Sequence, residues 1–450
     1  MRKQERRAWI CLALAVILLI GTGIFCYRYV KHGGEWATFY GNGQIYTDGR
    51  INRGTVTDRY GEELLSCTTD GFYYSDDYET RVATVHAVGD PDGNIPDGAI
   101  NVFRSQIIGY DLLNGIYDTS ASGKRIALTI DASANRAAYE SLGWQTGTVG
   151  VYNWKTGEIV CMVSTPTFDP AYDDYSDEED SIYFNNFLDG MITPGSTFKL
   201  VTAAAVIDHM ADRDSFRFEC DGVNQFGDGE NTQFTDVYEH GEVDFRDALA
   251  KSCNGAFGAL TREVGSKAMK EYAEKAGLTE PVEVDGIKTA AGSFDFPSDD
   301  DVKLSWAGIG QGDDLVNPCA MMVYMGAIAA GGEPVQPTLI KSASFLKEIR
   351  GGRSLGRYID EEVADELRSM MKYNVTETYG EYEDIDMYAK SGTAETGSDS
   401  PDAWFVGFTD DEDAPYAFVV WIKGGGSGAE AAAPVAANVI RTLKYSQPEE

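Results

Sequence analysis

A serine and a lysine three residues apart could together perform nucleophilic acyl transfer. Ser196 and Lys199 follow the turn-forming residues Thr193-Pro194-Gly195 and precede an apolar, alanine-rich run that extends to Ile207. This pattern predicts that Ser196 opens a helix, with Lys199 one turn on and on the same face. Free backbone N–H groups and the positive end of the helix dipole would then lie at the serine. Burial among apolar neighbours would disfavour the ammonium form, so that Lys199 could act as a base.

Two further strings could complete such a site. Ser252-Cys253-Asn254 lies between a short helical segment and an apolar helix start, so a turn there would project Ser252 and Asn254 on one side. Lys390-Ser391-Gly392-Thr393 lies on a predicted strand, where a glycine would let substrate backbone approach the strand edge. For the second string, ordinary helix-capping residues are the alternative interpretation.

Other matches to the same patterns fail on context. Ser369 and Lys372 come at the end of a long helical run, where no free N–H groups are expected. The run 133–135 reads as an ordinary helix start, and the run 155–157 as the tip of a hairpin.

The three strings resemble the S-x-x-K, S-x-N and K-T/S-G set of the serine acyl-enzymes that include β-lactamases and penicillin-binding proteins. Residues 53–61 resemble an R-G-x-I-x-D-R-x-G segment, residues 128–131 the entry to a catalytic domain, and residues 308–312 a G-Q-G loop. Over residues 50–445 the chain resembles a membrane-anchored class B penicillin-binding protein.

The resemblance implies a serine-type peptidoglycan D,D-transpeptidase that cross-links stem peptides and is inhibited by β-lactams. It implies a nucleophile, a base, a proton relay to the leaving amine, an amide that holds the substrate backbone and a group that holds the terminal carboxylate. In that order these are Ser196, Lys199, Ser252, Asn254, and Lys390 with Ser391 and Thr393. The backbone N–H groups of Ser196 and Thr393 would form the oxyanion hole.

Other functions remain open at this point. Water as the acceptor would make the chain a D,D-carboxypeptidase or a β-lactamase-like hydrolase. A penicillin sensor or a non-catalytic cell-wall scaffold are alternatives from other classes. Division or elongation proteins are possible partners, and the role in division, elongation or sporulation is open.

Composition restricts the partners and cofactors. The formal net charge of −35 argues against nucleic acid, because phosphates would be repelled. The acidic run 173–180 is predicted to be a solvated loop. Four scattered histidines and no Cys-x-x-Cys pair indicate no zinc site, so we expect neither a metal nor a cofactor.

The cysteines allow one disulfide hypothesis. Cys11 and Cys26 lie in the apolar N-terminal segment, which leaves an odd number, five, outside it. A bridge between Cys220 and Cys253 is possible because both lie in the active-site region. Small buried apolar side chains are the alternative.

The N-terminus predicts a single membrane span. Residues 9–27 are uncharged and long enough to cross a bilayer, and a basic cluster within residues 1–8 should remain cytoplasmic. A retained anchor is favoured over a cleaved signal peptide. The catalytic domain would then lie on the extracytoplasmic side of a bacterial cell membrane.

The rest of the chain divides into an N-terminal pedestal module, residues 28–144, and a penicillin-binding transpeptidase domain, residues 145–450. The fold class is α+β. An antiparallel five-stranded sheet covered by helices is expected from strands at 148–153, 158–163, 386–393, 403–408 and 416–422.

Overall fold

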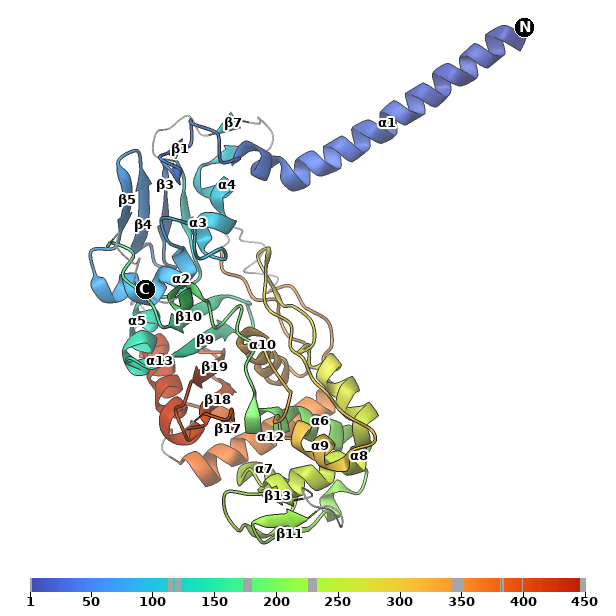
Figure 1. Ribbon diagram of the computed structural model, residues 1–450, viewed down its shortest axis with the longest axis vertical. Coiled ribbons are helices and arrows are strands. Elements are labelled where there is room, and N and C mark those ends of the chain that lie inside the picture. The colour runs from blue at the N-terminus through green and yellow to red at the C-terminus, as the bar shows by residue number, and fades with distance from the viewer. Residues whose placement is uncertain are drawn as a thin grey trace.

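The computed structural model describes residues 2–111, 116–117, 123–172, 180–225, 233–341, 352–380, 382, 384–398 and 400–445. Figure 1 shows a helix, α1, that projects from an elongated body in which small sheets adjoin a larger helix-covered sheet. Most of the predicted acidic loop, residues 173–179, lies outside the described residues.

The central sheet has five antiparallel strands in the order β10-β9-β19-β18-β17. They are β9 Gly147–Asn153, β10 Ile159–Thr165, β17 Met387–Ala394, β18 Asp402–Thr409 and β19 Tyr416–Ile422. Each lies within two residues of its predicted bounds, so the predicted α+β fold with a five-stranded sheet is confirmed. The strand that carries Lys390 to Thr393, β17, is at the edge of this sheet.

Both faces of the sheet are covered, which explains why its strands are apolar on both sides. Phe405 of β18 packs into one core cluster with α5 and α13, whereas its neighbours Trp404 and Val406 pack into another. The first cluster includes α5 Ala132–Leu142 and α13 Ala433–Tyr445. The second includes α6 Lys199–His209, α8 Asn254–Lys275, α10 Pro318–Ala329 and α12 Glu361–Asn374.

The N-terminal part of the body contains a second sheet of four strands in the order β5-β4-β3-β8. These are β3 Gly54–Thr57, β4 Glu63–Thr68, β5 Gly71–Tyr74 and β8 Arg125–Ala127, with β8 parallel to β3. The smaller elements here are β1 Tyr46–Thr47, β2 Arg50–Ile51, α2 Tyr78–Val88, α3 Ala99–Val102, α4 Arg104–Ile107, β6 Tyr110–Asp111 and β7 Ile116–Tyr117.

A group of short elements lies beyond α6 at the other end of the body (Figure 1). They are β11 Phe218–Cys220, β12 Val223–Gln225, β13 Gln233–Thr235, β14 Gly241–Val243 and α7 Phe245–Ala250. The hairpin of β15 Glu283–Val284 and β16 Ile287–Lys288 and the helix α9 Asp301–Ala307 follow α8.

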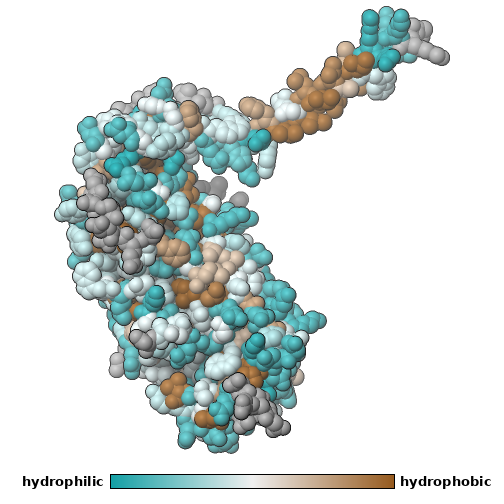
Figure 2. All heavy atoms as spheres, in the orientation of Figure 1, coloured by the Kyte–Doolittle hydropathy of each residue, from teal (hydrophilic) through white to brown (hydrophobic). Residues whose placement is uncertain are grey.

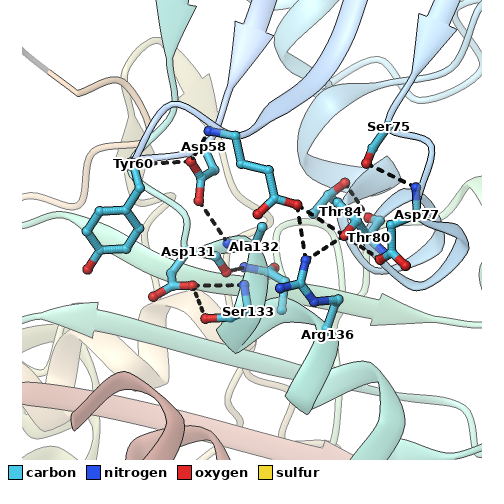
Figure 3. Close-up of polar contacts among 12 residues, drawn as sticks. Asp58, Tyr60, Ser75, Asp77, Thr80, Thr84, Asp131, Ala132, Ser133 and Arg136 are labelled. Carbon is cyan, nitrogen blue, oxygen red and sulfur yellow. Dashed lines mark hydrogen bonds and ion pairs between the residues drawn. The ribbon is translucent and has the colours of Figure 1, made fainter. Parts of the chain in front are cut away.

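Polar contacts of residues 58–62 and Thr80 tie the N-terminal sheet and α2 to the start of α5 (Figure 3). Asp58 Oδ1 accepts hydrogen bonds from the N–H groups of Tyr60 and Glu62, both at 2.8 Å, and Oδ2 accepts from Ala132 N at 3.3 Å. Arg136 of α5 donates to Glu62 Oε1 at 3.1 Å and to Thr80 Oγ1 at 2.7 Å. Asp58, Glu62 and Arg136 therefore form a structural junction with α5, and the division at residues 144 and 145 stays a prediction.

Helix α1, Arg2–Ala37, contains the predicted span. Its apolar side chains are exposed along its length, for example Leu18 at 71%, and Figure 2 shows them as a hydrophobic band behind a hydrophilic tip. Among the described residues it is the one helix long and apolar enough to cross a membrane. The chain therefore carries an N-terminal segment suited to a membrane anchor.

Candidate active site

Ser196 lies in a 3₁₀ turn, Gly195–Phe198, that leads directly into α6. The sequence predicted an α-helical start, and the structure begins instead with this tighter turn, at whose first residue Gly195 has a positive φ of 53° that only glycine adopts freely. A Cβ on Gly195 would lie 2.5 Å from the carbonyl oxygen of Thr393, so the turn packs directly on β17. Ser196 is thereby held against the edge strand.

Lys199 is fully buried. Its Nζ donates hydrogen bonds to Ser252 O at 2.6 Å, to Asn254 Oδ1 at 2.7 Å and to Ser252 Oγ at 3.2 Å. Burial lowers the pKa of this amine to about 8, against a smaller opposing effect of the Asp236 carboxylate. About a tenth of the Lys199 amine is therefore in the neutral, basic form at pH 7, and about half of it at pH 8.

The turn between α7 and α8 carries Ser252 and Asn254, as the sequence predicted. Ser252 has a φ of 56°, a left-handed conformation that is costly for a residue with a side chain. Asp236, which follows β13, accepts hydrogen bonds from Asn254 N at 2.6 Å and Gly255 N at 2.8 Å. This carboxylate caps the start of α8 and helps to hold the unusual turn.

Lys390 brings β17 into contact with the same turn. It is fully buried, and its Nζ donates to Ser252 Oγ at 3.1 Å and to Ser391 O at 2.7 Å. Burial, and then the positive charge of Lys199, lower its pKa well below the ordinary value for lysine. Two buried amines near one hydroxyl disfavour a second positive charge, so at least one of them is readily deprotonated.

Gly392 has a packing role that the sequence did not reveal. The prediction that its missing side chain admits substrate backbone at the strand edge stays a prediction. A Cβ at Gly392 would lie 2.8 Å from Thr197 Cγ2 and 3.0 Å from Trp404 Cβ. The glycine therefore allows the nucleophile turn to pack closely on β17.

A cavity of about 360 Å³ is lined by side chains from all three strings. The lining includes Ser196, Ser252, Asn254, Ser391 and Thr393. Lys199 and Lys390 do not line the cavity themselves but donate hydrogen bonds to Ser252, which does. Gly392 is not part of the lining and lies on β17 between Ser391 and Thr393. The structure thus brings the eight predicted residues into one region.

Tyr379 and Asp236 are neighbours of the site that sequence reasoning missed. Tyr379 OH accepts a hydrogen bond from Ser391 N at 2.8 Å and donates one to Ser391 Oγ at 2.7 Å. Tyr379 belongs to a π-helical turn, Val375–Tyr379, that follows α12. π-Helical turns are frequent at functional sites, so this turn could have pointed to Tyr379. The sequence alone does not reveal that such a turn forms.

The disulfide hypothesis is wrong for this structure. Cys220 and Cys253 are both buried free cysteines, as are Cys67, Cys161 and Cys319. Cys67, Cys161 and Cys319 fit the alternative interpretation, in which the cysteines are small buried apolar side chains.

Residues 147–441 match the family model of the penicillin-binding protein transpeptidase domain. The chain belongs to the penicillin-binding protein transpeptidase family. This penicillin-binding protein is also 25% identical over 388 residues to peptidoglycan D,D-transpeptidase PbpA of Mycobacterium tuberculosis, covering 78% of this chain and 79% of that one. It is 25% identical over 401 residues to stage V sporulation protein D of Bacillus subtilis, covering 82% of this chain and 59% of the relative.

Solved structures share the fold of this penicillin-binding protein. Penicillin-binding protein A from M. tuberculosis, as a ceftriaxone acyl-enzyme complex, superposes with a TM-score of 0.74 at 22% identity, covering 87% of this chain and 98% of that one. The D,D-transpeptidase domain of a peptidoglycan glycosyltransferase from Eggerthella lenta gives 0.72 at 24% identity, with the same two coverages. The predicted family, fold and transpeptidase class are therefore confirmed.

Proposed function

We propose that this protein is a peptidoglycan D,D-transpeptidase that works through an acyl-enzyme on Ser196 and is inhibited by β-lactams. The observation that carries the proposal is the position of Ser252 Oγ, which accepts hydrogen bonds from two buried amines, at 3.2 and 3.1 Å, at the wall of the cavity that Ser196 lines. A hydroxyl so placed can pass a proton between an amine and a substrate.

Acylation begins when neutral Lys199 accepts the proton of Ser196 Oγ. The oxygen attacks the carbonyl carbon between the two terminal D-alanines of a stem peptide, and the backbone N–H groups of Ser196 and Thr393 stabilise the negative oxygen that develops. As the C–N bond breaks, Ser252 gives its proton to the leaving D-alanine amine. An ammonium next to Ser252, on Lys199 or Lys390, replaces that proton.

Deacylation reverses the proton path. An amine from a neighbouring stem peptide attacks the ester, loses a proton through Ser252, and forms the new amide bond, while Ser196 Oγ regains its proton. Lys390, with the hydroxyls of Ser391 and Thr393, would bind the terminal carboxylate of the donor peptide. The side-chain amide of Asn254 would hold the backbone of the donor peptide. Its Oδ1 accepts a hydrogen bond from Lys199 Nζ and keeps a second lone pair for the substrate.

We further propose that α1 remains as the anchor and that the catalytic domain faces the outside of the bacterial cell membrane. The basic residues that precede the span support this orientation. Peptidoglycan stem peptides and β-lactams would be the ligands of the cavity, and division or elongation proteins would be partners on the same side of the membrane.

Covalent labelling by a fluorescent penicillin tests the nucleophile. Ser196→Ala should lose the label and the corresponding mass increase. Ser369→Ala is the matched control because Ser369 is also followed three residues later by a lysine but lies exposed within α12. Persistent labelling of Ser196→Ala would refute the assignment. Cross-linked products from a pentapeptide donor would favour transpeptidation, whereas release of D-alanine alone would favour a carboxypeptidase.

A further inference from the structure

Four side chains beside the active site gather their metal-binding atoms in a small volume. Two cysteine sulfurs, a histidine nitrogen and a carboxylate oxygen all lie within 4.8 Å of one another. They belong to Cys220, Asp236, His240 and Cys253. The predicted absence of a zinc site rested on sequence spacing, and these residues have no recognised spacing because three separate segments supply them, with Asp236 and His240 in the same connection between β13 and β14.

The separations among one carboxylate oxygen, Oδ2, the two sulfurs and the imidazole nitrogen lie near those of a tetrahedral metal ion, and the other oxygen, Oδ1, lies on the imidazole side. Cys220 Sγ lies 3.4 Å from Asp236 Oδ2 and 3.5 Å from His240 Nδ1, and Cys253 Sγ lies 3.5 Å from Asp236 Oδ2. His240 Nδ1 lies 3.8 Å from Asp236 Oδ1. In tetrahedral zinc sites, bonds of about 2.0 to 2.3 Å place the ligand atoms about 3.3 to 3.8 Å apart.

Local structure holds each ligand in place. Cys220 ends β11 opposite Gly241 of β14, which follows His240 directly. Asp236 follows β13, and its N–H donates to Gly222 O at 3.0 Å. Cys253 is the N-cap of α8. Little rearrangement would be needed, because the backbone on which these side chains stand is already fixed.

Burial and access also suit an ion. Both cysteines are at most 1% exposed, and the side chain of Asp236 is 1% exposed while that of His240 is 12% exposed. Asp236 and His240 line the active-site cavity, which gives an ion a route to the cluster. The carboxylate already accepts the N–H groups of Asn254 and Gly255, but each of its oxygens has a further lone pair for a metal.

We propose that Cys220, Asp236, His240 and Cys253 form a zinc site that fixes the turn of Ser252 and Asn254. Two thiols, one imidazole and one carboxylate make a donor set typical of zinc, whereas calcium and magnesium select oxygen ligands. Binding would release the two thiol protons to the solvent and leave both sulfurs as thiolates bonded to the ion.

The position of Cys253 connects this site with the reaction. It stands between Ser252 and Asn254, and Asp236 binds the backbone of the residues that follow. An ion shared by both would therefore hold Ser252 in its left-handed conformation beside Lys199 and Lys390. This positioning role rests on the proposed function, whereas zinc binding itself does not.

The full-length chain in detergent, stripped with a chelator, should regain about one equivalent of zinc when Zn²⁺ is supplied. Co²⁺ in place of zinc should give the near-ultraviolet absorption of cobalt–thiolate bonds. Cys220→Ser and His240→Ala should lose both signals. Cys161→Ser is the matched control, because Cys161 is equally buried but lies on β10 away from the cluster, and it should keep them.

Three results would overturn the proposal. These are no bound zinc in the wild-type chain, full zinc binding in Cys220→Ser and His240→Ala, or a Cys220–Cys253 disulfide found by peptide mass mapping of the unreduced protein. If the cysteine variants misfold, His240→Ala still tests zinc binding, because His240 lies at the rim of the cavity. The circular dichroism spectrum of His240→Ala, compared with that of the wild type, shows whether this variant is folded. Removal of zinc should also slow penicillin labelling, and a wild-type chain that never labels would refute the proposed function without affecting the zinc measurement.

Discussion

Lys199 and Lys390, which lie 191 positions apart in the sequence, donate hydrogen bonds to one and the same atom, Ser252 Oγ, over 3.2 and 3.1 Å. Because both amines are fully buried, neither can satisfy its charge with water. The hydroxyl between them keeps its own proton free for a third partner. This arrangement explains how one serine can serve as a proton relay in both half-reactions.

The pH dependence of acylation should follow the base. Burial lowers the pKa of Lys199 to about 8, so the neutral form that accepts the Ser196 proton increases as the pH rises to that value. The second-order rate constant of labelling by a fluorescent penicillin should therefore rise about tenfold per pH unit below pH 8 and level off above it. The measurement uses metal-free protein between pH 6 and 9.5. A rate that is flat across this range would exclude Lys199 as the titrating base.

Ser252 combines a chemical and a conformational role that two substitutions can separate. Both Ser252→Ala and Ser252→Gly remove the shared hydroxyl, and each should slow acylation by about 10²-fold or more. Glycine tolerates the φ of 56° whereas alanine does not, so Ser252→Gly should be about 1 kcal/mol more stable than Ser252→Ala. Urea unfolding of the two variants, with their labelling rates, gives both quantities. Equal stabilities would show that this backbone conformation carries no strain.

The close contact between Gly392 and Thr197 predicts a rescue. The added methyl group of Gly392→Ala would lie 2.8 Å from Thr197 Cγ2, so the nucleophile turn must shift, at a cost of about 1 to 3 kcal/mol and much of the labelling rate. Thr197→Ser removes Cγ2 but keeps the hydroxyl that donates to Pro194 O at 2.8 Å. The double variant should recover stability and labelling relative to Gly392→Ala alone. If it does not, the contact with Trp404 or another cause dominates.

Much of the fold could be predicted because local patterns determine it. The strands of the central sheet are short apolar runs bounded by turn residues. The string that begins at Ser196 follows a Pro-Gly turn and leads into an alanine-rich helix. The order of those strands could not be read, because β9 pairs with β19 across more than two hundred residues. The packing role of Gly392 could not be read for the same reason, since its contact with Thr197 depends on how two distant segments pack.

The neighbours of the site were missed because they act through long-range contacts. Tyr379 reaches Ser391 from a turn after α12, and Asp236 reaches Asn254 from the end of β13. Neither residue belongs to a motif, and each residue type is common on protein surfaces. Sequence reasoning identified the residues whose chemistry is intrinsic, whereas those that position them required the three-dimensional structure.

A pair of carboxyl groups joins the N-terminal part of the body to the segment before the nucleophile and predicts a pH-dependent stability. Asp97 precedes α3, and its side chain shares a hydrogen bond with that of Asp189, seven residues before Ser196. Burial, and then the charge of Asp97, raise the pKa of Asp189 to about 7. The pair therefore holds a proton in the folded protein at pH values where an unfolded aspartate, with a pKa of about 3.9, has lost it.

The sign of the effect follows from this raised pKa. The stabilisation is fully present below the pKa of the unfolded chain and is lost as the pH rises from about 4 to about 7, because the folded state binds more protons across this window. Asp189→Asn keeps a hydrogen-bonding side chain but cannot ionise, so its melting temperature should gain on that of the wild type between pH 5 and pH 8. Asp299→Asn, at an exposed position away from the pair, is the matched control and should run parallel to the wild type. Scanning calorimetry at several pH values makes the comparison, and parallel curves for wild type and Asp189→Asn would show that the two carboxyl groups share no proton.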